Sequence, residues 1–204
     1  MCYSRKRSAG RPPFAGSTRS ARWRKSIPRN SLYMTNSPII RQAAVQDAAT
    51  LRALRLEALQ NKPEAFASDP EAESKDSVED WEKRLAASDG TIFIADAGSE
   101  LAGMAGVGQY RHTKTRHNAI IWGVYVKPAW RGRKLARQLV EACVEWAREQ
   151  GLRSVRLGVI TTNPAAINSY IQAGFRVYGV EPEVIFHDGI YYDELLMIRD
   201  IVNK

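Results

Sequence analysis

The 204-residue sequence has little cysteine and no long apolar run. Its two cysteines, Cys2 and Cys143, are too few for a disulfide-stabilised scaffold. No stretch of about 18 apolar residues occurs, so the sequence predicts no membrane-spanning helix. It also lacks the apolar stretch of about 7–15 residues that a secretory signal requires. From these absences we expect a cytoplasmic protein.

Several signatures of nucleotide-binding, catalytic and metal sites are also missing. The sequence contains no P-loop pattern G-x-x-x-x-G-K-S/T, no dinucleotide pattern G-x-G-x-x-G and no hydrolase pattern G-x-S-x-G. The three histidines, His112, His117 and His187, lack paired ligand spacing and neighbouring cysteines. We therefore expect surface histidines and predict no metal.

Acidic residues are absent from residues 1–33, which carry nine of the 30 basic side chains. The remaining residues carry 21 basic and 22 acidic side chains, so the formal net charge of +8 belongs to this first segment. Because the segment is rich in Ser, Pro and Gly and has no apolar period, it is predicted to be a disordered tail.

Three explanations of this basic segment stay open. It is a basic arm for nucleic acid or another anionic surface, a segment that resembles a transit peptide, or an artefact of start-site choice with the true start at Met34. The sequence therefore predicts a single domain over residues 34–204. Because this domain is almost neutral, we do not expect it to bind nucleic acid.

Apolar periodicity and turn residues predict alternating strands and helices after Pro38. Strands are expected at 39–41, 91–95, 101–110, 119–126, 154–160, 175–180 and 190–198. Helices are expected at 46–60, from Ser77 onward, after the turn at 131–136 as far as Gln150, and at 163–173. The strand at 119–126 has few charges and is expected at the sheet centre. Residues 61–76 are expected to form a loop, because prolines interrupt them. The order β-α-α-β-β-β-α-β-α-β-β implies an α/β fold, a mixed sheet of about seven strands flanked by about four helices.

The turn at 131–136 joins the central strand to a long helix and has the physical properties of an anion site. The free N–H groups of a first helical turn point toward the end of the preceding strand, and the helix dipole adds positive charge there. Arg131, Arg133 and Lys134 add three full charges. A solvated basic loop is the alternative explanation of the same residues.

Two patterns in this part of the chain resemble the GNAT superfamily of N-acetyltransferases, over about residues 38–200. The first is the acetyl-CoA pattern R/Q-x-x-G-x-G/A between a strand and a helix, which here begins at Arg131 and ends at Ala136. The second is N-x-x-A-x-x-x-Y-x-x-x-G-F, which the sequence matches at every position, from Asn163 through Tyr170 to Phe175. One helix and one strand separate the two patterns, as in the family, and together they imply the GNAT acyl-CoA N-acyltransferase fold.

One residue departs from the family pattern. Lys134 stands where the family usually has glycine, which lets the backbone approach a pyrophosphate. We expect Lys134 in the first helical turn, with its N–H directed at the phosphate and its side chain outward. A contact of its ammonium with a phosphate stays open as the alternative.

The resemblance implies acetyl-CoA as acyl donor and a primary amine as acceptor, either of a small molecule or a protein amino group. The pyrophosphate is expected on the N–H groups of residues 132–136, and the pantetheine arm along the strand at 124–126. A gap between this strand and the strand at 154–160 is expected to admit the cofactor. The expected contacts to acetyl-CoA come from Val124, Tyr125, Val126, Arg131, Gly132, Arg133, Lys134, Leu135, Ala136, Arg137 and Asn163.

Direct acyl transfer requires a neutral amine, a donor to the developing oxyanion and a proton for the departing thiolate. Tyr170 matches the tyrosine acid of the family, and its alternative role is packing of the last helix. A backbone N–H in the 124–126 strand is the implied oxyanion donor. The general base stays open, with Tyr125 or a carboxylate of the 64–73 loop as candidates, namely Glu64, Glu71 or Glu73.

A non-catalytic module that senses or binds acyl-CoA, with a basic N-terminal arm, is the alternative to an enzyme. The intact second pattern, with Tyr170, favours the enzyme. Relatives often dimerise, so a homodimer stays open, although no residue in the sequence specifies an interface. No membrane partner is expected.

Overall fold

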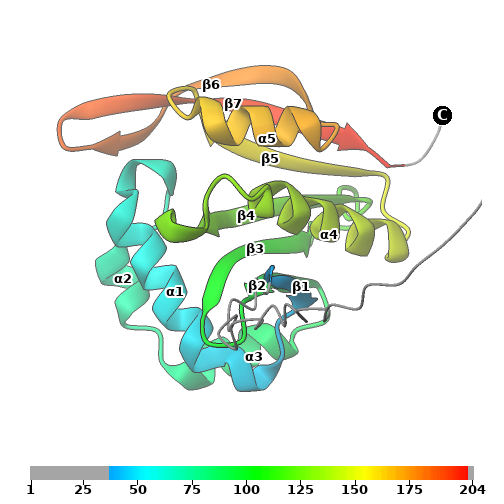
Figure 1. The fold of residues 1–204 in the computed structure, drawn as a ribbon. Helices are drawn as coiled ribbons and strands as arrows, with labels where there is room; N and C mark the ends of the chain where they lie inside the picture. The colour runs from blue at the N-terminus through cyan, green and yellow to red at the C-terminus, as the bar shows by residue number, and fades with distance from the viewer. Residues whose placement is uncertain (1–36, 202–204) are drawn as a thin grey trace, which may run out of the picture. The chain divides into compact units, whose positions relative to one another are not determined.

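A mixed sheet of seven strands organises the fold, in the order β1-β2-β3-β4-β5-β7-β6 (Figure 1). The computed structural model describes residues 37–201, so the predictions for residues 1–33 lie outside the described residues. The strands are β1 Ile39–Gln42, β2 Gly90–Asp96, β3 Leu101–Gln109, β4 Asn118–Val126, β5 Ser154–Ile160, β6 Arg176–His187 and β7 Ile190–Asp200. All neighbours pair antiparallel except β4 and β5, which are parallel. The central place of β4 is confirmed, and so is the predicted element order apart from one added short helix at Pro70–Ser74.

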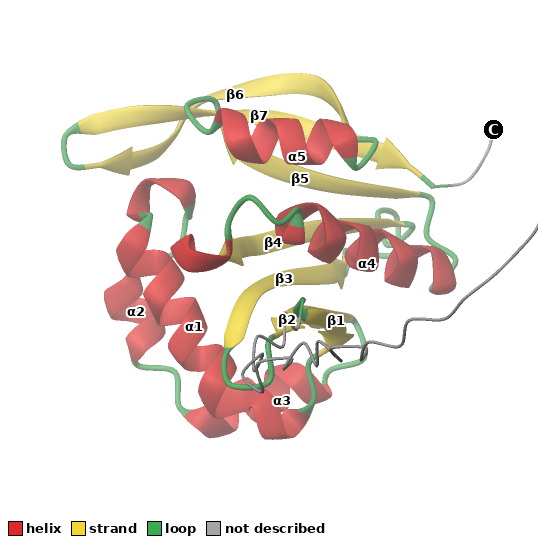
Figure 2. Cartoon of the chain, in the orientation of Figure 1, coloured by secondary structure: helices red, strands yellow, loops and turns green. Residues whose placement is uncertain are grey.

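Helices cover both faces of the sheet (Figure 2). They are α1 Ala48–Asn61, α2 Pro70–Ser74, α3 Val78–Ala86, α4 Leu135–Glu149 and α5 Pro164–Gln172, with 3-10 turns at Val45–Asp47, Pro63–Ala65 and Pro128–Trp130. Met104 packs with α1 and α3, while its neighbour Ala105 packs with α4, because successive strand residues point to opposite faces. No helix within residues 37–201 is long and apolar enough to cross a membrane.

The expectation of a loop over residues 61–76 was wrong in part, because this segment contains the Pro63–Ala65 turn and helix α2. Helix α2 begins after Asp69, whose side chain accepts a hydrogen bond from the Glu71 N–H at 2.7 Å. Pro70 occupies the first helical position, where its missing N–H costs nothing. The prolines therefore start short helices here and do not simply interrupt the chain.

Helix α4 supplies most of the core between itself and the sheet. Leu139, Val140, Cys143, Val144 and Ala147 follow one another at helical spacing and are almost completely buried. Burial of each large aliphatic side chain contributes on the order of 2 kcal/mol, which holds α4 firmly against the sheet. The prediction that Cys143 is a core residue is confirmed, and burial raises the pKa of its thiol, so it stays protonated.

Strands β4 and β5 pair over only three residues and then diverge. The register ends at Ile120 opposite Arg156. Beyond it, β4 carries a bulge against β3, where Gly123 has a φ of +64° and the pairing shifts between Met104 and Gly106. A bulge bends and twists its strand, and the positive φ favours glycine. From residue 121 to Val126, the edge of β4 that faces β5 therefore makes no ladder hydrogen bonds to it. This separation of the two strands is the expected gap.

Candidate active site

A cavity of about 490 Å³ occupies the gap between β4 and β5. Its walls come from the end of β4, the turn before α4, helix α5 and the 3-10 turn after α1. Ten of the residues expected at the site line it: Val124, Tyr125, Val126, Arg131, Gly132, Lys134, Leu135, Ala136, Asn163 and Tyr170. The fold thus brings both sequence patterns, which lie about one helix and one strand apart in the chain, to one cavity.

Two of the expected residues, Arg133 and Arg137, are not part of the cavity lining. The Arg133 guanidinium stacks over the ring of Trp130, 4.6 Å from the ring centroid. Arg137 pairs with Glu141 one turn further along α4, at 2.8 Å. Both side chains therefore contact other residues of the protein and lie outside the cavity lining.

The turn before α4 presents N–H groups at one end of the cavity. Gly132 has a φ of +79°, and the Arg131 Nε donates to the Val126 carbonyl at 3.1 Å, which ties the turn to the end of β4. The first N–H bonded within α4 is that of Gln138, which donates to the Lys134 carbonyl. The N–H groups of residues 135–137 therefore have no intrahelical partner and, with the helix dipole, suit an anion such as a diphosphate.

Lys134 is the residue at which the sequence-based expectation was wrong in detail. It does not lie in the first turn of α4 but immediately before it, with φ 60° and ψ 17°, and its side chain makes no capping hydrogen bond. This left-handed conformation costs a non-glycine residue on the order of 1 kcal/mol, because Cβ crowds the following carbonyl. Glycine at this position would provide the conformation without that cost.

Helix α5 carries Asn163 and Tyr170 at the other side of the cavity. The Asn163 Oδ1 accepts from the Ala166 N–H at 3.1 Å, and Pro164 fills the first turn, so the predicted cap is confirmed. The Tyr170 side chain is 6% exposed, and its hydroxyl has no hydrogen-bond partner within residues 37–201. Burial, then the nearby Cys143 and Glu194, raise the pKa of Tyr170, so the phenol keeps its proton.

The candidates for the general base are mostly engaged elsewhere. The Tyr125 hydroxyl donates to Glu57 and accepts from Asn61, each at 3.0 Å. Burial raises the pKa of this phenol, and the hydrogen bond to Glu57 adds to the rise, while that from Asn61 opposes it. Tyr125 therefore does not release its proton readily and is a poor base.

The three loop carboxylates differ in where they lie. Glu73 forms a two-pronged ion pair with the buried Arg55, at 2.7 and 3.0 Å. The Glu71 side chain is 85% exposed and lies 4.0 Å from Lys75. Glu64 lines the cavity and pairs with Lys62 at 3.2 Å. Of the three, only Glu64 borders the cavity, and it already has a cationic partner.

Sequence reasoning did not single out several residues that the fold brings to the cavity. They are Lys62, Ala65, Phe66, Trp130, Ile160, Thr162, Ala165 and Ser169. Residues 62–66 lie in the segment expected to be a loop, and no local pattern places that segment over the sheet. Thr162 precedes the second sequence pattern and Ser169 lies within it, so proximity to Asn163 and Tyr170 was the available signal.

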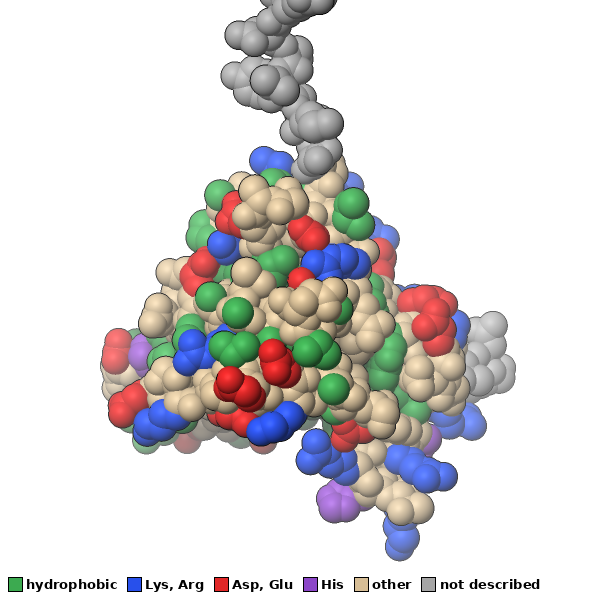
Figure 3. Space-filling view, turned by 90° about the horizontal axis from the view of Figure 1, so that it is seen from below, with side chains coloured by type: hydrophobic (Ala, Val, Ile, Leu, Met, Phe, Trp, Pro, Cys, Tyr) green, Lys and Arg blue, Asp and Glu red, His purple; other side chains and the backbone are tan. Residues whose placement is uncertain are grey.

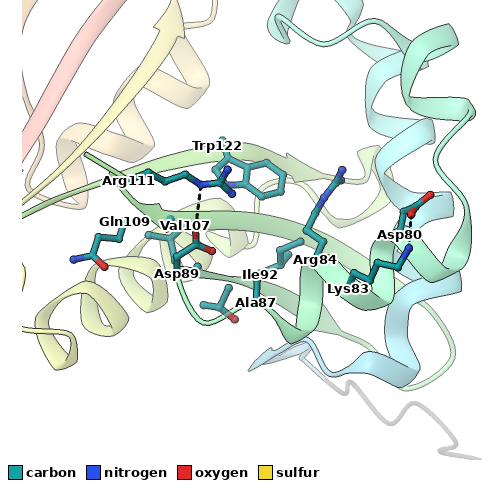
Figure 4. A pocket seen from close by; sticks show the side chains of 13 residues that line it. Asp80, Lys83, Arg84, Ala87, Asp89, Ile92, Val107, Gln109, Arg111 and Trp122 are labelled. Carbon is teal, nitrogen blue, oxygen red and sulfur yellow. Dashed lines mark hydrogen bonds and ion pairs between the residues drawn. The ribbon is translucent and has the colours of Figure 1, made fainter. Parts of the chain in front are cut away.

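A second cavity, of about 500 Å³, lies between α3 and the β2–β3 hairpin (Figure 4). Its charged side chains pair within the protein: Lys83 with Asp80 at 3.0 Å and Arg111 with Asp89 at 3.1 Å. Arg84 pairs with Asp76 just outside the lining and stacks over Trp81. Acidic and basic side chains also lie next to one another on the face drawn in Figure 3. Neither the second cavity nor this face therefore favours an anionic over a cationic ligand.

Comparison with known proteins agrees with the geometry of the first cavity. The family model described as acetyltransferase (GNAT) family matches residues 53–175, more than half of the chain. An L-methionine sulfoximine/L-methionine sulfone acetyltransferase from Pseudomonas aeruginosa is 32% identical over 93 residues, which cover 46% of this chain. The aligned part spans 54% of that relative, about half its length.

Solved structures extend the likeness to the whole described fold. A GNAT acetyltransferase from Streptococcus pneumoniae has a TM-score of 0.71 and 25% identity, over 80% of this chain and 99% of its own. A putative acetyltransferase from Salmonella typhimurium, solved with acetyl-CoA, has a TM-score of 0.69 and 23% identity, over 82% of this chain and 95% of its own. With the family match, the split sheet and both motifs at one cavity, the chain belongs to the acetyltransferase (GNAT) family.

Proposed function

We propose that the chain transfers the acetyl group of acetyl-CoA to the amino group of a small amine. The observation that carries this proposal is one cavity with three features: the free N–H groups of α4, the unpaired edge of β4 and the hydroxyl of Tyr170. These features match the three chemical parts of the donor in order: diphosphate, pantetheine arm and thioester sulfur.

The donor would lie along the gap. Its diphosphate would accept hydrogen bonds from the N–H groups of residues 132–136, and Arg131 would add positive charge. Arg133 and Arg137, outside the lining, would contribute at longer range. The pantetheine amides would pair with the free edge of β4 at Val124–Val126 as an added strand does. Asn163 caps α5 through its Oδ1, and its Nδ2 would contact the arm.

The reaction would proceed by direct attack of a neutral amine on the thioester. The β4 edge would donate a backbone N–H to the carbonyl oxygen as it becomes an oxyanion. Tyr170 would protonate the departing thiolate, an alkyl thiolate whose conjugate acid has a pKa of roughly 8.5 in water. Burial raises the pKa of Tyr170, but it raises that of the thiol in the same cavity as well, so the transfer stays feasible.

For the acceptor, we propose small amines and free amino acids. The support is the relative from Pseudomonas aeruginosa, whose name gives methionine sulfoximine and methionine sulfone as substrates. The test is an amine panel with acetyl-CoA, scored by release of free thiol and by the rise in melting temperature that the donor causes. We expect both signals. Stabilisation by acetyl-CoA without thiol release for any amine would indicate a binding module, and no stabilisation at millimolar donor would remove the family-based function.

A further inference from the structure

Glu194 on β7 is a carboxylate that the sheet places beside the gap. In the β5–β7 register Glu194 lies directly opposite Ile160, and its side chain shares a face with Gly158. A Cβ at position 158 would lie 2.9 Å from the Cδ of Glu194, closer than real atoms approach. The missing side chain at Gly158 therefore leaves the space that the carboxylate fills.

The Glu194 carboxylate is not itself part of the cavity lining, but its neighbours place it next to the reaction site. Gly158 comes two residues after Arg156, the last residue of β5 that pairs with β4. Ile160, opposite Glu194, lines the cavity. The charge of Glu194 contributes to the raised pKa of Tyr170, so the two groups lie within electrostatic reach of each other. Glu194 thus lies beside the gap, on the sheet face opposite α4 and α5, because the alternate β5 residues Leu157 and Val159 pack with those helices.

Within residues 37–201, the side-chain carboxylate of Glu194 has no ion-pair or hydrogen-bond partner. Its opposite neighbour on β6 is another acid, Glu181, and the burial of Glu194, followed by the charge of Glu181, raises the pKa of Glu194. Arg156 on the same face of β5 stacks over the ring of Tyr178, 5.7 Å from its centroid, and Glu64, on the turn that contacts β5 and β6, pairs with Lys62. A half-buried carboxylate without a cation is suited to receive one.

We propose that Glu194 binds the ammonium group of the acceptor and removes its proton before the amine attacks acetyl-CoA. This proposal rests on the proposed function. Asp193, the residue before Glu194, has a different role. Its Oδ1 accepts a hydrogen bond from the Glu183 N–H at 2.9 Å and holds the β6 bulge. Glu73 and Glu64 already have cationic partners, Arg55 and Lys62, whereas Glu194 has none within residues 37–201 and is therefore our choice for the acceptor.

The proton and bond changes balance as follows. The Glu194 carboxylate takes one proton from the ammonium, and the amine nitrogen attacks the thioester carbonyl carbon. The C–S bond breaks, the thiolate takes the Tyr170 proton, and the phenolate regains a proton from the nitrogen of the new amide. The Glu194 acid then releases its proton to water. The net change is one ammonium and one thioester converted to one amide, one thiol and one proton.

The first experiment compares Glu194→Gln with Glu183→Gln, a matched change at an exposed glutamate on β6, in the full chain. We expect Glu194→Gln to lower kcat/KM at pH 7 about 100-fold, the scale of acid–base catalysis, with unchanged acetyl-CoA affinity. The acid limb of the pH profile should disappear in Glu194→Gln and remain in Glu183→Gln. A Glu194→Gln chain with wild-type kcat/KM, or with the acid limb intact, overturns the role of Glu194.

Weakly basic acceptors separate proton removal from a structural effect. An amine whose pKa lies below the assay pH arrives neutral and needs no base, so the ratio of wild-type to Glu194→Gln activity should shrink at least several-fold for such amines. An equal ratio for strongly and weakly basic amines contradicts the proposal.

A double-mutant cycle uses the space at Gly158. Gly158→Ala should displace the carboxylate and lower kcat in the wild-type chain at least several-fold, but by less than about two-fold in a Glu194→Ala chain. Equal losses in both chains contradict the proposal. If the wild-type chain binds acetyl-CoA but releases no thiol with any amine, the proposed function fails and the role of Glu194 with it. An active wild-type chain and an equally active Glu194→Gln chain reject Glu194 alone.

Discussion

Arg55 and Glu73 form a buried two-pronged ion pair between α1 and the end of α2, with nitrogen–oxygen distances of 2.7 and 3.0 Å. The Arg55 guanidinium also lies against the ring of Phe66, 5.0 Å from its centroid, and its Nη1 is 3.3 Å from where a Cβ of Gly123 would lie. One buried charge thus links the cavity wall at Phe66 to the bulge that opens the sheet.

Glu73→Gln should destabilise the protein by about 3 kcal/mol, because it leaves the Arg55 charge buried without a counter-ion. Urea unfolding at pH 7 measures the loss. Glu71→Gln is the control, since that side chain is 85% exposed, and it should change the free energy of unfolding by less than about 0.5 kcal/mol. Equal effects of the two changes would show that the ion pair carries no stability.

Lys134→Gly should stabilise the protein by about 1 kcal/mol, because glycine adopts the left-handed conformation at this position without strain. The greater freedom of glycine in the unfolded chain will offset part of this gain. Thermal unfolding measures the difference, and acetyl-CoA titration should show affinity within a few-fold of wild type. A large loss of affinity would show that the lysine ammonium contacts a phosphate.

Tyr170→Phe should lower kcat by about 100-fold and leave acetyl-CoA affinity little changed, because only the proton donor is lost. Tyr191→Phe on β7 is the control, since that side chain is 59% exposed and lies outside the cavity lining. Steady-state kinetics with a fixed amine and direct titration of acetyl-CoA separate the two effects. Unchanged kcat in Tyr170→Phe would leave the tyrosine a packing role alone.

The parts of the site that local sequence predicts are those within one element. Asn163 and Tyr170 lie on α5 because the cap, the first-turn proline and the apolar spacing all specify that helix. Arg131 and Gly132 could be placed at the turn because the order of strand, turn and helix is readable in the local sequence. Local patterning therefore predicted Asn163 and Tyr170 on this wall of the cavity, but not their neighbours Thr162, Ala165 and Ser169.

The parts that escaped prediction depend on contacts between distant segments. Glu194 meets Gly158 only through the β5–β7 register, and no local pattern determines that register. Glu73 meets Arg55 only because α2 forms in a segment expected to be a loop. The left-handed conformation of Lys134 is invisible in a sequence that lacks the usual glycine. Register, short helices and strained residues are therefore the features that needed the structure.

A chain that starts at Met34 should keep the melting temperature and the thiol-release activity of the full chain, because every cavity residue lies after it. Any affinity for DNA should fall with salt in the full chain and disappear in the shortened one, since the excess positive charge lies in residues 1–33. DNA affinity that survives in the shortened chain would place a nucleic-acid site on the domain. Loss of activity would assign residues 1–33 a role in the reaction.

Glu194→Gln should make the protein more stable at pH 7 to 8 while it lowers activity. Burial and the charge of Glu181 raise the pKa of Glu194 in the folded state, so the folded state binds this proton more tightly than the unfolded chain does. The stability contributed by this group is present below the unfolded pKa of roughly 4.3 and is lost as the pH rises through the folded pKa. The neutral glutamine avoids that loss, and because Glu194 is only half buried we expect a gain below about 1 kcal/mol. Urea unfolding of both chains from pH 4 to 8 measures it, and a difference that grows toward low pH would contradict the assigned direction. A gain in stability with a loss of activity at one residue is the pattern expected where a site keeps an unpaired charge for its substrate.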